Sequence, residues 1–171
     1  MLSGQVLDDI NKPDYLVRIL NNEELRFIAG RIVKSEVGSS PNYESIKSIF
    51  ESNVSEFRYY EYGEILRPFF STEEIRKGEH EVIAISYILH FLGIYFIMIL
   101  DDDQSRKFVE GNFPELARNM MGTVGFVGEC CCSYNIFSKE EAITILMLID
   151  KSKFRIRKET IEEIVEKIEG C

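Results

Sequence analysis

Apolar and polar residues follow one another along the chain in patterns that predict an α/β architecture. Residues 78–91, GEHEVIAISYILHF, form an apolar segment with two acids in its first turn, which predicts a buried helix. Gly93 can end this helix in the left-handed conformation. Residues 94–100, IYFIMIL, are apolar on both faces and rich in β-branched and aromatic side chains, which predicts a central strand. This order favours a parallel sheet covered on both sides by helices.

The first third of the chain predicts shorter elements. Residues 5–9, QVLDD, predict a short strand that ends in acids, and Pro13 begins a predicted helix over residues 13–20. Residues 31–37, RIVKSEV, can form a helical turn that carries Glu36. A further helix is expected over residues 40–50, and the aromatic residues 55–63 predict another strand.

The remainder of the chain is helical in pattern. Four segments between residues 104 and 171 have this character, DQSRKFVEG, GTVGFVGECCCSYN, KEEAITILMLIDK and KETIEEIVEKIEG. The chain shows no internal repeat and no low-complexity linker. We therefore expect one domain over residues 1–171, with a helical C-terminal extension at about residues 136–171.

Charge limits the partners that this chain can bind. The 171 residues are 45% apolar, enough for one buried core, and carry a formal net charge of -9. A pI near 4.9 argues against binding nucleic acid through general electrostatics, so a contact with RNA must be local. Arg106 and Lys107, beside an acidic cluster, are the first candidates for such contacts. The basic stretch at residues 151–158, KSKFRIRK, is either a second candidate or a solvated turn between helices.

The cysteines and the N-terminus favour a reducing compartment. Cys130, Cys131 and Cys132 are contiguous, so the four cysteines do not form a spaced disulfide framework, and they lack the spacing of a zinc site. The first residues do not resemble a signal peptide. A cytoplasmic protein with reduced cysteines is the simplest interpretation.

One segment also has the length of a membrane span. Residues 82–100 contain no formal charge. Ser86, His90 and Gly93 interrupt this run, which favours a helix, a glycine turn and a strand, with no membrane contact. A small membrane-associated protein remains the alternative.

Carboxylates follow the predicted strands at two places. Asp101, Asp102 and Asp103 come directly after residues 94–100, and Asp8 and Asp9 follow the opening strand. In open parallel sheets, ligands bind outside the carboxyl ends of the strands. A site made only of carboxylate oxygens suits Mg²⁺ or Mn²⁺, which can activate water for attack on a phosphodiester. The alternative is that these aspartates cap the helices that follow them.

Three further acids and two histidines are weaker candidates. Glu79 and Glu81 lie about 200° apart around a helix, so only one of them can be a direct ligand. Glu36 stands between apolar residues, where an ordinary surface acid is also common. His80 and His90 lack metal-ligand spacing, and we interpret both as structural.

Several motifs together resemble a PIN domain of the prokaryotic branch. The motifs are VLDD at residues 6–9, RIVKSEV at 31–37, GEHEVIAIS at 78–86, ILDDDQSRK at 99–107 and GTVGFV at 122–127. Relatives in that branch read GExEAIALA, then a strand ending in IDDxxAR, and then GTxG. The order and spacing agree over nearly the whole chain.

The resemblance implies a three-layer α/β/α fold with a central parallel sheet and a helical C-terminal portion. It also implies an Mg²⁺- or Mn²⁺-dependent ribonuclease, similar to VapC toxins that a small antitoxin protein holds inactive, and a homodimer as in many relatives. Matching by motif gives the implied catalytic residues as Asp8, Glu36, Glu81 and Asp102. The implied metal ligands are Asp8, Glu81, Asp101 and Asp102.

One departure from the family pattern supports a second hypothesis. Relatives usually have Thr or Ser after the first aspartate, where this chain has Asp9. Together with the strong acidity, this departure favours a PIN-like nucleic-acid-binding or protein-interaction scaffold with little catalytic activity.

Overall fold

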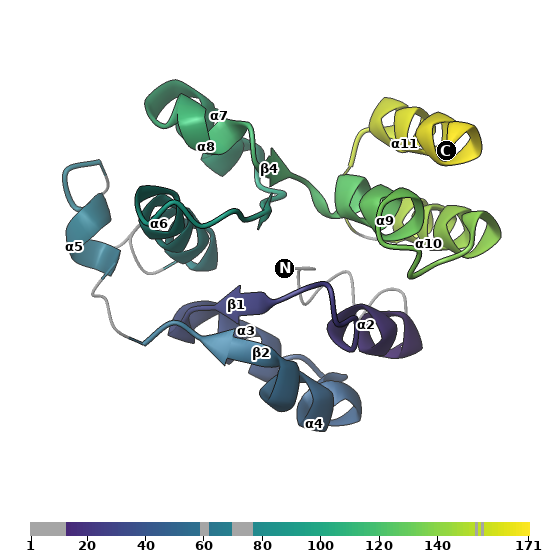
Figure 1. Cartoon of the computed structure of the whole chain (residues 1–171), viewed down its shortest axis with the longest axis horizontal. Helices are drawn as coiled ribbons and strands as arrows, with labels where there is room; N and C mark the ends of the chain where they lie inside the picture. Colours follow the sequence, from purple (N-terminus) through teal and green to yellow (C-terminus); the bar gives the residue numbers. More distant parts are fainter. Residues whose placement is uncertain (1–12, 59–61, 70–76, 153, 155) are drawn as a thin grey trace. The chain divides into compact units, whose positions relative to one another are not determined.

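The protein is mostly helical (Figure 1). The computed structural model describes residues 13–58, 62–69, 77–152, 154 and 156–171, of which 65% are helical. Two compact units share the chain, and each is assembled from segments that are separate in the sequence. Among the described residues, unit 1 contains 28–38 and 55–122, and unit 2 contains 13–27, 39–54 and 123–171. The single domain expected over residues 1–171 stays a prediction.

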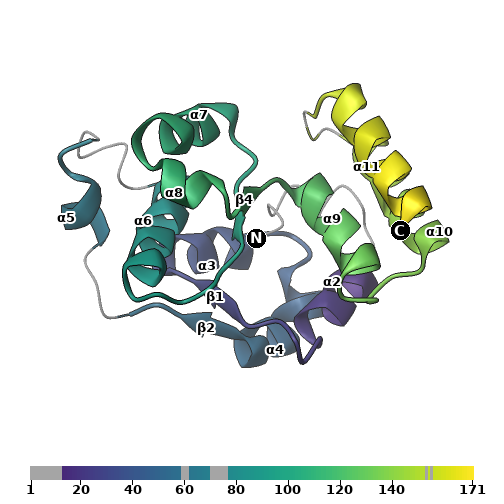
Figure 2. The ribbon, with the colours of Figure 1, turned by 45° about the horizontal axis from the view of Figure 1, so that its top comes forward.

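Helix α6 (Gly78–Phe91) is the centre of unit 1 (Figure 2). Its apolar sequence leaves most of its residues buried, and it packs against α3, α5, α7 and α8. The elements around it are β1 (Phe27–Ala29), α3 (Arg31–Gly38), β2 (Val54–Glu56), α5 (Tyr62–Leu66), β3 (Met98–Ile99), α7 (Asp103–Asn112), α8 (Pro114–Ala117) and β4 (Met120–Met121).

The core of unit 1 forms where α6 meets the helices that follow it. Its largest fully buried side chains include Ile83 on α6 and Leu116 on α8. Aromatic rings close one side, because Phe113 makes edge contacts with Phe69 and Phe108. The buried members of this core are Leu66, Ile83, Ala84, Met98, Leu100, Val109, Phe113 and Leu116.

The three-layer α/β/α fold with a central parallel sheet is wrong. The described residues contain two sheets of two strands each, β1 with β2 and β3 with β4. Strands β3 and β4 are parallel, with Met98 opposite Met120 and Ile99 opposite Met121. The strand expected over residues 55–63 is also shorter in the described part, because β2 ends at Glu56.

The strand expected over residues 94–100 is reduced to β3, and the cause lies at the end of α6. Gly93 has φ 69°, and the N–H groups of Gly93 and Ile94 donate to carbonyls of α6 at 2.9 and 3.0 Å. These N–H groups are therefore used by the helix terminus and cannot begin a strand ladder. Residues 91–95 are exposed in consequence. Their apolar composition is typical of a buried strand, but the turn at Gly93 ends the helix there and keeps them out of a sheet.

In its described residues, unit 2 contains the helices α2 (Pro13–Leu20), α4 (Tyr43–Asn53), α9 (Thr123–Cys132), α10 (Lys139–Lys151) and α11 (Lys158–Gly170). Helix α2 packs on α4, and α9, α10 and α11 lie against one another (Figure 1). Ser138 and Glu141 form a capping box at the start of α10. Glu141 also pairs with Arg18 of α2 at 2.5 Å, and Tyr15 stacks edge-on against Phe137.

Several predicted elements are confirmed. Helices α2 and α6 have the predicted bounds, and Gly93 is left-handed. Helices α10 and α11 lie within the C-terminal portion that was expected to be helical. Within the described part of the chain, no helix is long and apolar enough to cross a membrane, so residues 82–100 do not form a spanning helix.

Candidate acidic site at the start of helix α6

Glu81 lies in the first turn of α6, and its side chain caps the N-terminus of α3. Its side chain is 1% exposed, and its two oxygens accept the N–H groups of Ile32 and Val33 at 3.0 and 2.8 Å. These N–H groups belong to the first turn of α3, where a helix has no internal acceptor for them. A Cβ built on Gly30 would lie 2.0 Å from Cδ of Glu81, so glycine makes room for this carboxylate.

Glu36 approaches the same end of α6 from α3. Its carboxylate packs against Gly78, where an added Cβ would lie 2.5 Å from Oε2. Partial burial raises the pKa of the Glu36 carboxyl, and the charges of Glu79 and Glu81 raise it further. A hydrogen bond from the backbone N–H of Gly78 lowers this pKa in part. Glu36 is therefore held among like charges.

Asp102 stands at the turn between β3 and α7. Its side chain accepts the N–H of Ser105 at 2.7 Å and caps α7, which confirms the capping alternative. Burial raises the pKa of the Asp102 carboxyl, but the hydrogen bonds from Ser105 and Gln104 and the charge of Lys77 together hold it below its ordinary value. Because Lys77 directly precedes Gly78, this lysine links Asp102 electrostatically to the neighbourhood of Glu36.

We call Glu36, Glu79, Glu81 and Asp102 the α6 acidic cluster. Glu79 and Glu81 lie in the first turn of α6 and their charges act on Glu36, whereas Asp102 is related to this end of α6 through the charge of Lys77. The carboxylate of Asp101 lies against Gly122, where an added Cβ would be 3.0 Å from its Oδ1. Asp8 lies outside the described residues. Among the residues that are described, no three carboxylates bring oxygens within 4.8 Å of one another.

The two basic candidates, Arg106 and Lys107, lie on α7, the helix that Asp102 caps. Arg106 is partly buried, and its Nη1 donates to the carbonyl of Leu100 at 2.9 Å. This bond fixes the guanidinium beside the turn that carries Asp102. Lys107 is exposed. Both positions stay predictions as RNA contacts.

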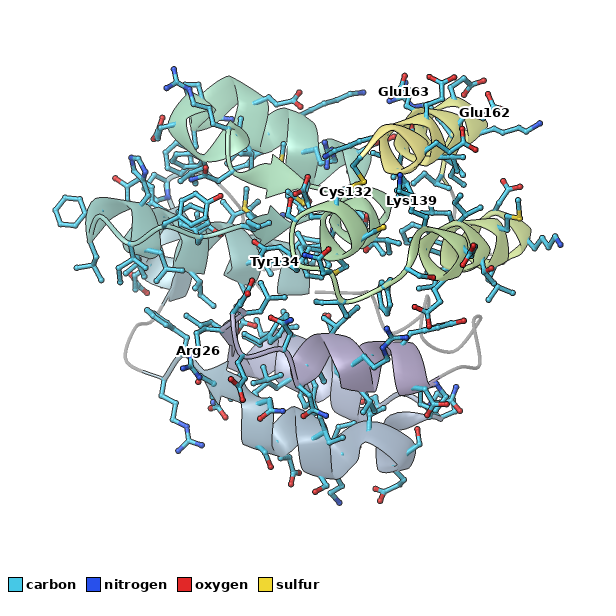
Figure 3. All side chains as sticks on the ribbon, turned by 45° about the vertical axis from the view of Figure 1, so that its right-hand side comes forward. Arg26, Cys132, Tyr134, Lys139, Glu162 and Glu163 are labelled. Atoms are coloured by element: carbon cyan, nitrogen blue, oxygen red, sulfur yellow. A yellow bond between two sulfur atoms is a disulfide. The ribbon has the colours of Figure 1, made fainter. Side chains whose placement is uncertain are left out.

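A second cluster of reactive groups, in unit 2, was missed by the sequence reasoning. Cys132 of α9 and Cys171 after α11 form a disulfide, so the expectation of reduced cysteines is wrong for this pair. The sulfur of Cys131 lies within 4.8 Å of both. Figure 3 labels Cys132 at the end of α9. The partners are 39 residues apart, and no local pattern marks that pairing.

The chain matches no protein-family model, no curated protein and no solved structure. The resemblance to PIN domains therefore stays a prediction that rests on the quoted motifs. The fold that it implied is corrected above.

Proposed function

We propose that the protein is a cytoplasmic Mg²⁺- or Mn²⁺-dependent ribonuclease that uses the α6 acidic cluster. The observation that supports this proposal is the environment of Glu36, an exposed residue whose carboxyl has a raised pKa because of desolvation and the charges of Glu79 and Glu81. Carboxylates that repel one another are stabilised by a divalent cation. An acid whose pKa is shifted by specific charged neighbours is a candidate for a functional site.

The described acids fit a hard cation in the kind of ligand that they offer. Mg²⁺ keeps several waters and is often held by one or two carboxylates together with substrate phosphates. Glu36 and Asp102 are the acids best placed for this, because both oxygens of Glu81 already accept backbone N–H groups. Asp101 and Asp8 are the further ligands expected from the motifs. With so few protein ligands, the coordination of the cation would be completed by water and by phosphate oxygens of the RNA.

The residues suggest how such a site works. A bound cation supplies Lewis acidity, which lowers the pKa of water and offsets charge on the phosphate. Arg106 uses one N–H group on Leu100 and has others that can bind a phosphate oxygen. Lys107 adds a positive charge on the exposed side of α7.

Cleavage of labelled single-stranded RNA with Mn²⁺, Mg²⁺ or a chelator tests the proposal. Asp102→Asn is the sharpest variant, because asparagine is also a good N-cap and preserves α7 while removing the charge. We expect this variant and Glu36→Gln to lose Mn²⁺ binding and cleavage together. Glu110→Gln, an exposed acid on the same helix, is the matched control. Absence of Mn²⁺-dependent cleavage in the purified wild type refutes the proposal.

A second candidate function is that of a protein-interaction scaffold. The turn after α6 favours it, because Phe91 and Tyr95 are each 81% exposed and Leu92 and Ile94 are about half exposed. Contiguous exposed apolar residues mark protein contacts. The partner is a small antitoxin-like protein or a second copy of the chain. Sedimentation of the wild type and of Phe91→Ser with Tyr95→Ser tests self-association, which the double variant should weaken.

A further inference from the structure

Three cysteine sulfurs meet where helices α9 and α11 end. Cys131 and Cys132 are the last residues of α9, and Cys171 directly follows α11. Their sulfur atoms all lie within 4.8 Å of one another. Cys131 is buried with a free thiol, and Cys132 and Cys171 are joined as a disulfide.

We propose that reduction of the Cys132–Cys171 disulfide converts this cluster into a binding site for one thiophilic d¹⁰ cation, Zn²⁺ in the first instance, held by Cys131, Cys132 and Cys171. Zinc–thiolate bonds are about 2.3 Å long, so three sulfurs around one tetrahedral zinc lie roughly 3.8 Å apart. The sulfur of Cys131 already lies within 4.8 Å of both partners, and the sulfurs of Cys132 and Cys171, bonded at 2.08 Å in the disulfide, must separate by roughly 1.7 Å after reduction to reach this spacing. Three protein sulfurs leave one position of a tetrahedral zinc for water, and Cys171 is exposed to solvent.

The conversion balances in electrons and protons. A dithiol reductant transfers two electrons and two protons to the disulfide, which yields two thiols and the oxidised reductant. Together with Cys131 these make three thiols. Binding of the cation as three thiolates then releases three protons, so affinity rises with pH. A disulfide oxidant, which accepts two electrons and leaves as a dithiol, re-forms the Cys132–Cys171 bond, Cys131 regains its proton and the cation is released.

The electrostatics of the cluster favour a bound cation over free thiolates. Two helices end at it, and the C-terminus of a helix carries partial negative charge. Three thiolates without a cation are therefore disfavoured there. Cys130 does not belong to the site, because its sulfur is not among those that lie within 4.8 Å of one another.

The cluster stays assembled when the disulfide is open, because other contacts hold α11 on α9 and on α10. Lys167 of α11 pairs with Glu129 of α9 at 2.5 Å. Lys139, labelled in Figure 3, donates to the carbonyl of Glu169 at 2.9 Å. Ile168 is completely buried. The three sulfurs thus remain neighbours in the reduced protein.

The test uses the full chain, reduced with a phosphine and titrated with Zn²⁺ against a chromophoric chelator. We expect one Zn²⁺ per reduced chain and none per oxidised chain. Co²⁺ in place of Zn²⁺ should give the thiolate charge-transfer bands of a tetrahedral site. Since loss even of outer partners lowers metal affinity about 10- to 100-fold, loss of a direct ligand in Cys131→Ser or Cys171→Ser should lower it by at least that factor.

Cys130→Ala is the matched control, because it removes the neighbouring thiol that lies outside the cluster. It should bind Zn²⁺ like the wild type. Failure of the reduced wild type to bind Zn²⁺ would overturn the proposal, as would full affinity in Cys131→Ser. Mapping of a Cys131–Cys171 disulfide in protein that binds no metal would also overturn it, in favour of simple thiol–disulfide exchange. None of these outcomes depends on ribonuclease activity.

Discussion

Replacing Glu81 by glutamine should destabilise unit 1 strongly. The carboxylate is 1% exposed and accepts two N–H groups from the first turn of α3 at 3.0 and 2.8 Å. Hydrogen bonds to a charged group contribute about 1.5–3 kcal/mol each. Glutamine keeps one acceptor oxygen and turns an NH₂ donor toward the other N–H. We therefore expect a loss of about 2–4 kcal/mol in the free energy of unfolding, because one bond is lost and one buried N–H is left unpaired.

Urea unfolding followed by circular dichroism measures this loss. With a slope of about 2 kcal/mol per M, the expected loss lowers the midpoint by roughly 1–2 M. Glu79→Gln is the matched control, because Glu79 lies in the same first turn of α6 and is only partly buried. It should change the free energy of unfolding by less than about 0.5 kcal/mol. Equal midpoints for the two variants would refute the assignment of Glu81 as the acceptor for α3.

Three further predictions concern stability. Gly30→Ala should lower the free energy of unfolding, measured by urea titration, by about 1–3 kcal/mol or more, as overpacking a core does, because the added Cβ collides with the Glu81 carboxylate. Gly111→Ala in α7 is the control, because its added Cβ enters open space and should raise the free energy of unfolding by about 0.4–1 kcal/mol. The raised pKa of Glu36 contributes stability that is present below the ordinary pKa of glutamate and is lost as pH rises through the pKa of the folded protein. The melting temperature of Glu36→Gln should therefore rise relative to that of the wild type between pH 4 and pH 7. A constant difference between the two melting temperatures over this range would contradict the prediction. Ser138→Ala should lower stability by about 1 kcal/mol through loss of the capping box, and an unchanged melting temperature would exclude that role.

Local signals in the sequence were sufficient for some elements. Helix α6 has the predicted bounds because glycine stands at its first position and near its end, with an uninterrupted apolar segment between. Helix α2 likewise begins at a proline. Asp102 was weighed as a helix cap because aspartate at such a turn is typical of one, and the structure confirms that role.

The features that the sequence did not predict correctly depend on contacts between residues that are distant in the chain. Glu81 was assigned to a metal, but its nearest partners are N–H groups 48 and 49 residues earlier, which no local pattern identifies. Residues 94–97 had the composition of a strand, and the backbone hydrogen bonds at the end of α6 prevented it. The disulfide partner of Cys132 lies 39 residues away. Sequence periodicity reports which face of a helix is buried and does not report what it is buried against.

The bond between Glu81 and α3 has a consequence for the order of folding. An eight-residue helix is too short to persist alone in water, and α3 has no acidic residue in its first turn. Its first N–H groups find their acceptor only when α6 has docked, so α3 should form late, as a product of the long-range collapse. Amide hydrogen exchange can test whether α3 depends on α6 in this way. The amides of Ile32 and Val33 should exchange at the rate at which α6 separates from α3, and they should lose their protection together in any variant that loosens α6.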